Sequence, residues 1–206
     1  MKKNFIILFL LFIIPTKAFA LIEVDITRGN LNPLPLAVSP LSIDNKSKKS
    51  FEKILEKENI GSEISSIVEN NLRISGLFNP LNKDAFLQAP DIANLKPRFE
   101  DWNLIKAQAL ITGKVNYVDG KLRVEFRLWD VLAAKEMMAL AFTTVPNNWR
   151  RVGHILSDKV YERLTGEKGY FDTRIIYVAE EGPKTQRKKR LAIMDQDGAN
   201  NKFLTL

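Results

Sequence analysis

The sequence predicts a mixed α/β domain in which helices pack on one face of an antiparallel-rich sheet, followed by a short all-β region. Three observations predict this class. Apolar residues recur at helical spacing between residues 62 and 76. Two segments that alternate between apolar and polar residues, 109–118 and 121–130, are joined by an Asp-Gly pair. A second amphipathic helix is expected over 146–166.

The composition is that of an ordinary globular protein. The chain has 206 residues, of which 45% are hydrophobic and 27% are charged, and this balance argues against a disordered chain. Because the chain contains no cysteine, no disulfide framework supports it, and its stability must come from a packed core. The formal net charge is +7, and three of the lysines lie within the first 20 residues.

Residues 1–20 are predicted to be a signal peptide for export. Two lysines precede ten uninterrupted apolar residues, 5–14, about half of the roughly 20 that a membrane-spanning helix needs. The small residues Ala18 and Ala20 then form a cleavage site, so the mature chain is expected to begin at Leu21 without a transmembrane segment. An uncleaved N-terminal anchor is the alternative, because a lysine also lies close to the cleavage site.

The expected mature N-terminus has the pattern of a two-sided strand. Apolar side chains alternate with polar ones, and a glycine-containing segment ends the run. The residues are Leu21, Ile22, Glu23, Val24, Asp25, Ile26, Thr27, Arg28, Gly29 and Asn30. Such a terminal strand is an edge strand, which can pair within its own domain or add to the sheet of a partner. A strand that is docked at home and released for a partner is a third alternative, and the residues alone favour none of them.

Several segments are predicted between this strand and the hairpin. Residues 36–41 form a short apolar strand, and the polar residues 44–61 form a loop with some helix. The next helix begins with Ser62 as N-cap and ends before Gly76, with Ile64, Ile67, Val68 and Leu72 on its apolar face. Residues 78–81 (Phe-Asn-Pro-Leu) turn the chain, and residues 98–107 form a shorter helix that carries Phe99, Trp102 and Ile105.

The hairpin leads into a third strand and a long helix. Asp119-Gly120 is a strong hairpin signal between its flanking strands. Residues 136–145 are predicted to be the third strand, and Pro146 then opens the helix that Gly166 closes. The apolar stripe of this helix consists of Trp149, Val152, Leu156, Val160 and Leu164. We expect both Trp102 and Trp149 to be core residues.

The residues after this helix have a different character. Residues 173–179 and 191–194 are predicted to be short strands, joined by the basic loop 184–190, and 195–198 form a turn before another extended segment. No helix is expected to cover these strands. Because a few short strands are marginal in water, they are interpreted as the opening of a further β domain that the chain does not complete.

No catalytic, cofactor or metal site is predicted. The single histidine, His154, is expected to be a partly exposed structural residue beside the apolar stripe. Asp195 and Asp197 could be cation ligands, but without further acidic residues at calcium-loop spacing a turn is the better interpretation. The run Arg187–Arg190 lacks interleaved aromatic residues, which favours a solvated loop over a site for nucleic acid or anionic lipid.

Three stretches of the sequence resemble the TolB family of the Tol-Pal envelope system. They are residues 72–81 (LRISGLFNPL), 111–115 (ITGKV) and 164–178 (LTGEKGYFDTRIIYV), in the order of the family; the ending DGANNKFLTL is also similar to its propeller repeat. The resemblance implies an α/β N-terminal domain followed by a β-propeller. It implies a signal peptide over 1–20, a partner-binding strand over 21–33, the α/β domain over 34–170 and the start of an incomplete propeller over 171–206.

The resemblance also implies partners and a location. Members of this family are periplasmic and not enzymes; the extreme N-terminus binds the C-terminal domain of inner-membrane TolA, and the propeller binds the lipoprotein Pal at the outer membrane. The matching TolA-binding positions here are Leu21 to Asn30. The implied role is envelope integrity, protein import and outer-membrane constriction during cell division. The alternatives are a propeller-containing envelope enzyme such as a peptidase, or an envelope protein that binds anionic surfaces.

Overall fold

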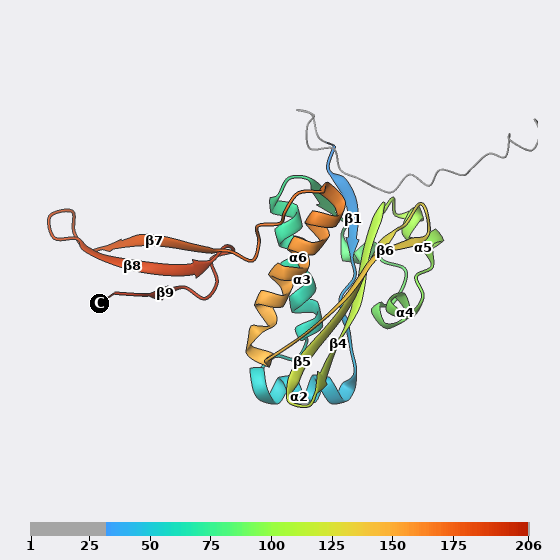
Figure 1. Ribbon diagram of the computed structural model, residues 1–206, viewed down its shortest axis with the longest axis horizontal. Coiled ribbons are helices and arrows are strands. Elements are labelled where there is room, and N and C mark those ends of the chain that lie inside the picture. Colours follow the sequence, from blue (N-terminus) through green and yellow to red (C-terminus); the bar gives the residue numbers. More distant parts are fainter. Residues whose placement is uncertain (1–31, 206) are drawn as a thin grey trace, which may run out of the picture.

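The computed structural model describes residues 32–205, which form a mixed α/β domain and a second, smaller sheet (Figure 1). The predicted signal segment, its cleavage site and the predicted strand from Leu21 to Asn30 lie outside the described residues. In the part that is described, no helix combines the length and the apolar character needed to cross a membrane.

The first sheet has strand order β3-β1-β4-β5-β6, and the short strand β2 also pairs with β4. Its strands are β1 (Leu34–Val38), β2 (Ser42–Ile43), β3 (Phe78–Pro80), β4 (Ala109–Val118), β5 (Lys121–Asp130) and β6 (Lys135–Thr144). The three long strands β4, β5 and β6 are antiparallel, whereas β1 lies parallel to both β3 and β4. The sheet is therefore mixed, with its antiparallel part at the hairpin.

The predicted hairpin is confirmed residue for residue. Val118 pairs with Lys121 across the turn, and the two residues between them both have positive φ, 50° for Asp119 and 75° for Gly120. Two successive left-handed residues match the natural twist of the flanking strands, which explains why this dipeptide is such a strong signal.

Two long helices cover one face of this sheet, α3 (Ile60–Ile74) and α6 (Trp149–Thr165) (Figure 1). The predicted stripe of α6 is buried, and so are the alternate residues of β5 that face it. Burial of one such large side chain contributes about 1.5–3 kcal/mol. The helices approach closely at Gly153, where a Cβ would lie 2.9 Å from Cγ2 of Ile67. This packing supplies most of the main core.

The opposite face is partly covered by α4 (Pro90–Leu95) and α5 (Phe99–Leu104) (Figure 1). Leu110 of β4 points to this side, because its neighbours along the strand belong to the main core. Trp102, 1% exposed, fills this smaller core and donates its indole N–H to Oε1 of Gln88 (3.1 Å). The fold class is as predicted, with this second cluster added on the other face.

One local prediction between residues 44 and 81 is confirmed in part, and two are wrong. The polar segment after β2, expected to be a loop with some helix, contains the helix α2 (Asn45–Leu55), whereas the N-cap of α3 is Asn59 rather than Ser62. The expected turn at 78–81 is instead the strand β3, because Phe78 and Pro80 are buried beside β1. Gly76, with φ 74°, does end the α3 segment as predicted.

Capping explains why α2 forms despite its polar sequence. The Asp44 carboxylate accepts hydrogen bonds from the backbone N–H (2.8 Å) and the hydroxyl (2.7 Å) of Ser47, which lower the pKa of that carboxyl. Ser47 Oγ in turn accepts the backbone N–H of Tyr117 (2.8 Å) on β4, and Phe51 is fully buried. One cap and one buried aromatic side chain therefore attach this helix to the sheet.

The second sheet has strand order β7-β8-β9, all antiparallel, and extends away from the first domain (Figure 1). Its strands are β7 (Arg174–Glu181), β8 (Lys188–Asp195) and β9 (Lys202–Phe203). The predicted strands are thus present, but β8 begins earlier than expected. Residues 188–190 of the predicted basic loop belong to it.

Candidate functional site

The site predicted for TolA, Leu21 to Asn30, lies outside the described residues, as do the cleavage residues Ala18 and Ala20. The structure does describe the point at which this segment joins the domain. Leu34 begins β1, which lies between β3 and β4. Its N–H donates to the carbonyl oxygen of Leu77 (2.9 Å), and the carbonyl oxygen of Pro35 accepts the N–H of Gln108 (2.9 Å). The attachment point is therefore held on both sides.

The second sheet exposes apolar side chains on both of its faces. Ile176 and Val178 of β7 point to one face and are 62% and 58% exposed. Ile175 of β7 and Phe203 of β9 point to the other face and are also exposed. Two apolar faces in one thin sheet are typical of a surface that another protein layer covers.

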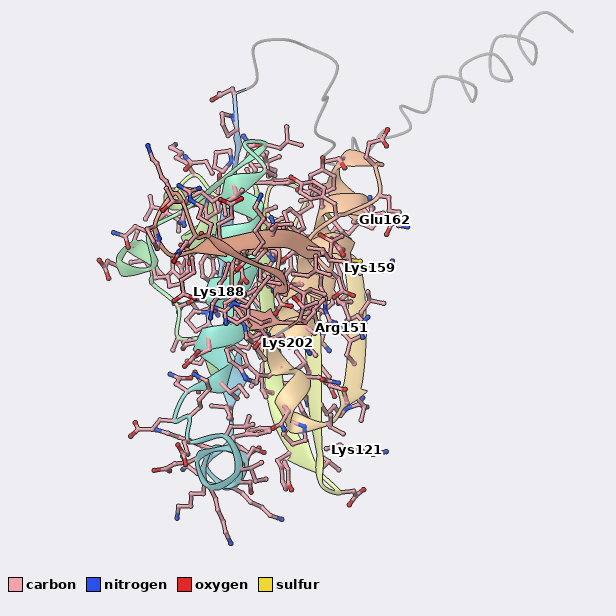
Figure 2. The ribbon with its side chains drawn as sticks, turned by 90° about the vertical axis from the view of Figure 1, so that its left-hand side faces the viewer. Lys121, Arg151, Lys159, Glu162, Lys188 and Lys202 are labelled. Atoms are coloured by element: carbon pink, nitrogen blue, oxygen red, sulfur yellow. The ribbon has the colours of Figure 1, made fainter. Side chains whose placement is uncertain are left out.

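The basic run at the edge of this sheet is paired with acidic residues. Glu180 accepts from Arg187 and from Lys189 (3.0 Å), and Arg190 pairs with Glu181. These hydrogen bonds, that from Arg187 foremost, lower the pKa of the Glu180 carboxyl. Lys188 lies on the same strand (Figure 2). Because acidic residues neutralise most of the positive charges beside Lys188, the basic run provides little support for binding to nucleic acid or anionic lipid.

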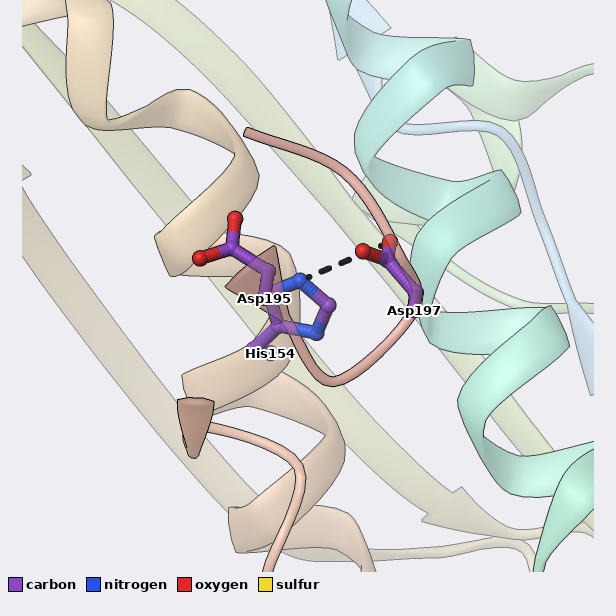
Figure 3. A group of neighbouring side chains, drawn as sticks. All are labelled: His154, Asp195 and Asp197. Carbon is purple, nitrogen blue, oxygen red and sulfur yellow. Dashed lines mark ion pairs between the residues drawn. The ribbon is translucent and has the colours of Figure 1, made fainter. Parts of the chain in front are cut away.

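His154 is buried at the contact between α6 and the second sheet (Figure 3). The expectation that it is partly exposed is wrong, because the residue is only 3% exposed. The predicted turn after β8 exists, and it brings Asp197 against this helix, with Oδ2 at 3.6 Å from Nε2 of His154. Arg150, one turn earlier on α6, donates to the same Asp197 oxygen. Sequence reasoning missed this contact because nothing local relates positions so far apart.

Hydrogen bonds on the Nδ1 side of the imidazole ring indicate the tautomer of His154. Ser157 donates its hydroxyl proton to the carbonyl oxygen of Gly153 (2.9 Å), so its oxygen accepts from the amide of Asn71 (2.9 Å). The same Asn71 amide donates to Nδ1 of His154 (3.0 Å). Nε2 therefore carries the proton in the neutral ring; it faces Asp197 at 3.6 Å without forming a hydrogen bond. Ser157 does not contact the ring, so the pair is not a nucleophile–base couple.

The cluster also includes Asp195, and its geometry could suggest a metal site. His154, Asp195 and Asp197 offer ligand atoms within 4.8 Å of one another. However, each carboxylate already faces a guanidinium group, Arg150 at Asp197 and Arg174 at Asp195 (3.8 Å). A metal would also need the Nε2 lone pair, which the proton occupies. The arrangement fits a polar contact between two parts of the chain better than a metal centre.

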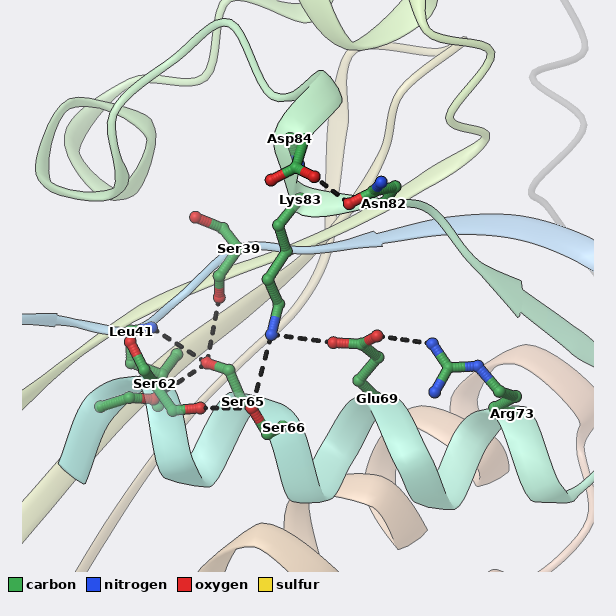
Figure 4. A network of polar contacts seen from close by, with 11 residues as sticks. Ser39, Leu41, Ser62, Ser65, Ser66, Glu69, Arg73, Asn82, Lys83 and Asp84 are labelled. Atoms are coloured by element: carbon green, nitrogen blue, oxygen red, sulfur yellow. Dashed lines mark hydrogen bonds and ion pairs between the residues drawn. The ribbon is translucent and has the colours of Figure 1, made fainter. Parts of the chain in front are cut away.

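A second polar network lies on α3 and has a structural role (Figure 4). Ser65 Oγ accepts the N–H of Leu41 (3.0 Å) and lies 3.1 Å from the carbonyl oxygen of Ser39, which ties the helix to the end of β1. Glu69 pairs with Lys83 (2.8 Å) and Arg73 (2.5 Å). These groups satisfy one another, and the network therefore fixes α3 rather than presenting a reactive group.

Two sequence comparisons with known proteins point to one family. A family model described as the TolB amino-terminal domain matches residues 22–137. The chain is 84% identical over 200 residues to the Tol-Pal system protein TolB of Pelagibacter ubique (strain HTCC1062). That alignment covers 97% of this chain but 45% of the relative, so the chain spans less than half of the length of the relative.

A solved structure shows the same fold. The crystal structure of TolB from Acinetobacter baumannii superposes with a TM-score of 0.68 and 24% sequence identity. The superposition covers 90% of this chain and 42% of that one. It therefore includes the mixed α/β domain and part of the second sheet.

Proposed function

This chain belongs to the TolB amino-terminal domain family, and from that premise we propose that it is a periplasmic protein-interaction component of the Tol-Pal envelope system. The observation that carries the proposal is the family match that begins at Ile22, together with 84% identity to a Tol-Pal system protein. In this proposal the protein links inner-membrane TolA to Pal at the outer membrane. The link supports envelope integrity and constriction of the outer membrane during cell division, without catalysis.

The TolA contact is assigned to Leu21 to Asn30. A segment with this alternation can add as a strand to the edge of another sheet, where backbone hydrogen bonds provide affinity. Ile22, Val24 and Ile26 would then occupy apolar pockets, and Glu23 and Asp25 would face basic residues of TolA. The structure supports this role through β1, because a strand bonded on both sides provides a fixed attachment point on the C-terminal side of this segment.

The Pal contact is assigned to the propeller. The second sheet begins a propeller-like part after the α/β domain. Its exposed apolar faces, with Val178 on one and Phe203 on the other, support a role as the first layer of a larger β structure. Binding of Pal is therefore proposed for a complete propeller, of which this sheet would be one part.

The test removes the proposed TolA strand. Protein without residues 21–30 should lose at least about tenfold in affinity for the C-terminal domain of TolA, measured by titration calorimetry, because the backbone partners are gone. Its circular dichroism and melting temperature should match those of the full mature chain, since the first described strand starts at Leu34.

A matched control distinguishes specific apolar contacts of the proposed strand from nonspecific hydrophobic association. Serine at Ile22, Val24 and Ile26 should also weaken TolA binding, whereas serine at the exposed residues Leu87, Leu95 and Leu104 should leave it unchanged. Unaltered affinity after deletion of residues 21–30 would overturn the assignment.

A further inference from the structure

The chain between the two sheets is fixed to α6 as far as Asp172. Phe171 is fully buried in the main core, and the carboxylate of Asp158 accepts the backbone N–H of Phe171 (2.6 Å) and of Asp172 (3.1 Å). Gly169 is needed here, because a Cβ would lie 2.4 Å from Cα of Asp158. The linker therefore leaves the first domain at one defined point, close to Thr173.

Beyond this point the second sheet meets α6 chiefly through the turn after β8. Within residues 32–205, the ion pair that joins α6 to this sheet is that of Arg150 with Asp197, and the ring of His154 lies 3.6 Å from the same carboxylate oxygen. The side chain of Asp197 is only 11% exposed and lies against the helix (Figure 3). One carboxylate thus carries the charged contact between the two parts.

The rest of this contact is polar. A cleft of about 390 Å³ separates the start of α6 from the second sheet, and its lining includes Asn148, Arg151, Arg174 and Asn200. Polar contacts of this kind between domains permit relative motion, whereas large apolar interfaces resist it. The arrangement of the two sheets therefore depends on a small number of specific interactions.

We propose that Asp197 is a latch that holds the second sheet against α6, with Arg150 and His154 as its receptor. Asn71, itself bonded to Ser157, donates to Nδ1 and so holds the ring of His154 with Nε2 3.6 Å from the carboxylate of Asp197. When Asp197 leaves, the guanidinium of Arg150 loses its carboxylate partner, which favours the closed arrangement. Because the latch is polar and consists of one residue, it opens as a unit and frees the sheet to rotate about Thr173. This inference goes beyond the proposed partners and does not depend on them.

The latch can be tested by a distance measurement between the two parts. The chain has no cysteine, so spin labels can be placed at Lys159→Cys on α6 and Lys188→Cys on β8, both exposed positions (Figure 2). Wild-type protein should give one narrow distance distribution by pulsed electron paramagnetic resonance. Asp197→Asn should broaden it roughly twofold or more, because the open arrangements become populated.

The substitution and its control are chosen to leave the folds intact. Asn at position 197 keeps an oxygen that can accept the N–H of Ala199, as Asp197 does now (3.1 Å). The control, Glu180→Gln, removes the same charge from ion pairs that lie within the second sheet, and it should leave the distribution narrow.

A second variant covers the case in which the turn itself is disturbed. Arg150→Met removes the partner on α6 without touching the second sheet, and it should broaden the distribution as well. If both Asp197→Asn and Arg150→Met retain the wild-type distribution, the latch is overturned. The latch is equally overturned if Glu180→Gln broadens the distribution as much as they do.

Discussion

Two valines show how differently the two sheets are stabilised. Val124 of β5 and Val178 of β7 each lie in an antiparallel strand of alternating pattern, yet Val124 is 0% exposed and Val178 is 58% exposed. The two strands therefore have the same kind of pairing and the same kind of sequence pattern. The first sheet has α3 and α6 on one face, and the second sheet has no helix on either face in residues 32–205. A strand pattern therefore specifies a strand, but a covering layer decides whether the apolar face is buried.

The largest expected difference in the free energy of unfolding is between truncations of one aromatic residue in each sheet. Phe126→Ala in the first sheet should lower the free energy of unfolding by about 3–5 kcal/mol, because the side chain is 1% exposed. Phe203→Ala, at a residue that is 49% exposed, should change it by less than about 0.5 kcal/mol. Urea titrations followed by tryptophan fluorescence report on the first domain, since Trp102, Trp129 and Trp149 all lie there. Equal losses of unfolding free energy from the two substitutions would contradict the proposed difference between the two sheets.

Hydrogen exchange should sharpen the same contrast along the backbone. Amides of β4 and β5 should exchange only on global unfolding, whereas those from about Thr173 onward should exchange through local opening, with a free energy at least about 2 kcal/mol smaller. Strand β6 is a useful internal reference, because it is an edge strand of the first sheet. Protection of β7 equal to that of β5 would show that the second sheet is stabilised by contacts other than those described.

The smallest expected effect concerns the response to acid. Burial raises the pKa of Glu69, but hydrogen bonds from Lys83 and Arg73 outweigh burial, and the net pKa is below 4.5. A lowered pKa in the folded state adds stability above about pH 4.5, and this contribution is lost as the pH falls through the folded value. Glu69→Gln should therefore reduce stability at about pH 7 by less than about 1 kcal/mol, and the difference should shrink below about pH 4.

The matched control for this prediction lies in the second sheet. The pKa of Glu180 is also lowered, by hydrogen bonds from Arg187 and Lys189, but this residue lies on the surface of the second sheet. Glu180→Gln should leave the urea midpoint of the first domain unchanged at both pH values. A shift as large as that of Glu69→Gln would mean that the two sheets unfold as one unit.

Local signals in the sequence were sufficient for the elements with strong patterns. The hairpin at Asp119-Gly120 and the helix closed by Gly166 are confirmed, because each depends on residues that are neighbours in the chain. Some helix was expected over residues 44–61, but the bounds of α2 were not predicted, because its apolar content is low and the cap at Asp44 supplies part of its stability. Strand β3 was missed because Phe78 and Pro80 extend only by pairing with β1, which is distant in sequence.

The candidate sites also divide into features that have a local sequence pattern and contacts that depend on the tertiary structure. The amino-acid sequence alone determined the alternating segment from Leu21 to Asn30, the hairpin, the stripe of α6 and the turn around Asp197, since the pattern of each is complete within a few residues. Only the tertiary structure decided that this turn lies against His154 and that Arg150 holds it there. A contact between a helix and a turn that is distant in sequence depends on how two sheets are placed, and that placement follows from packing rather than from any local pattern.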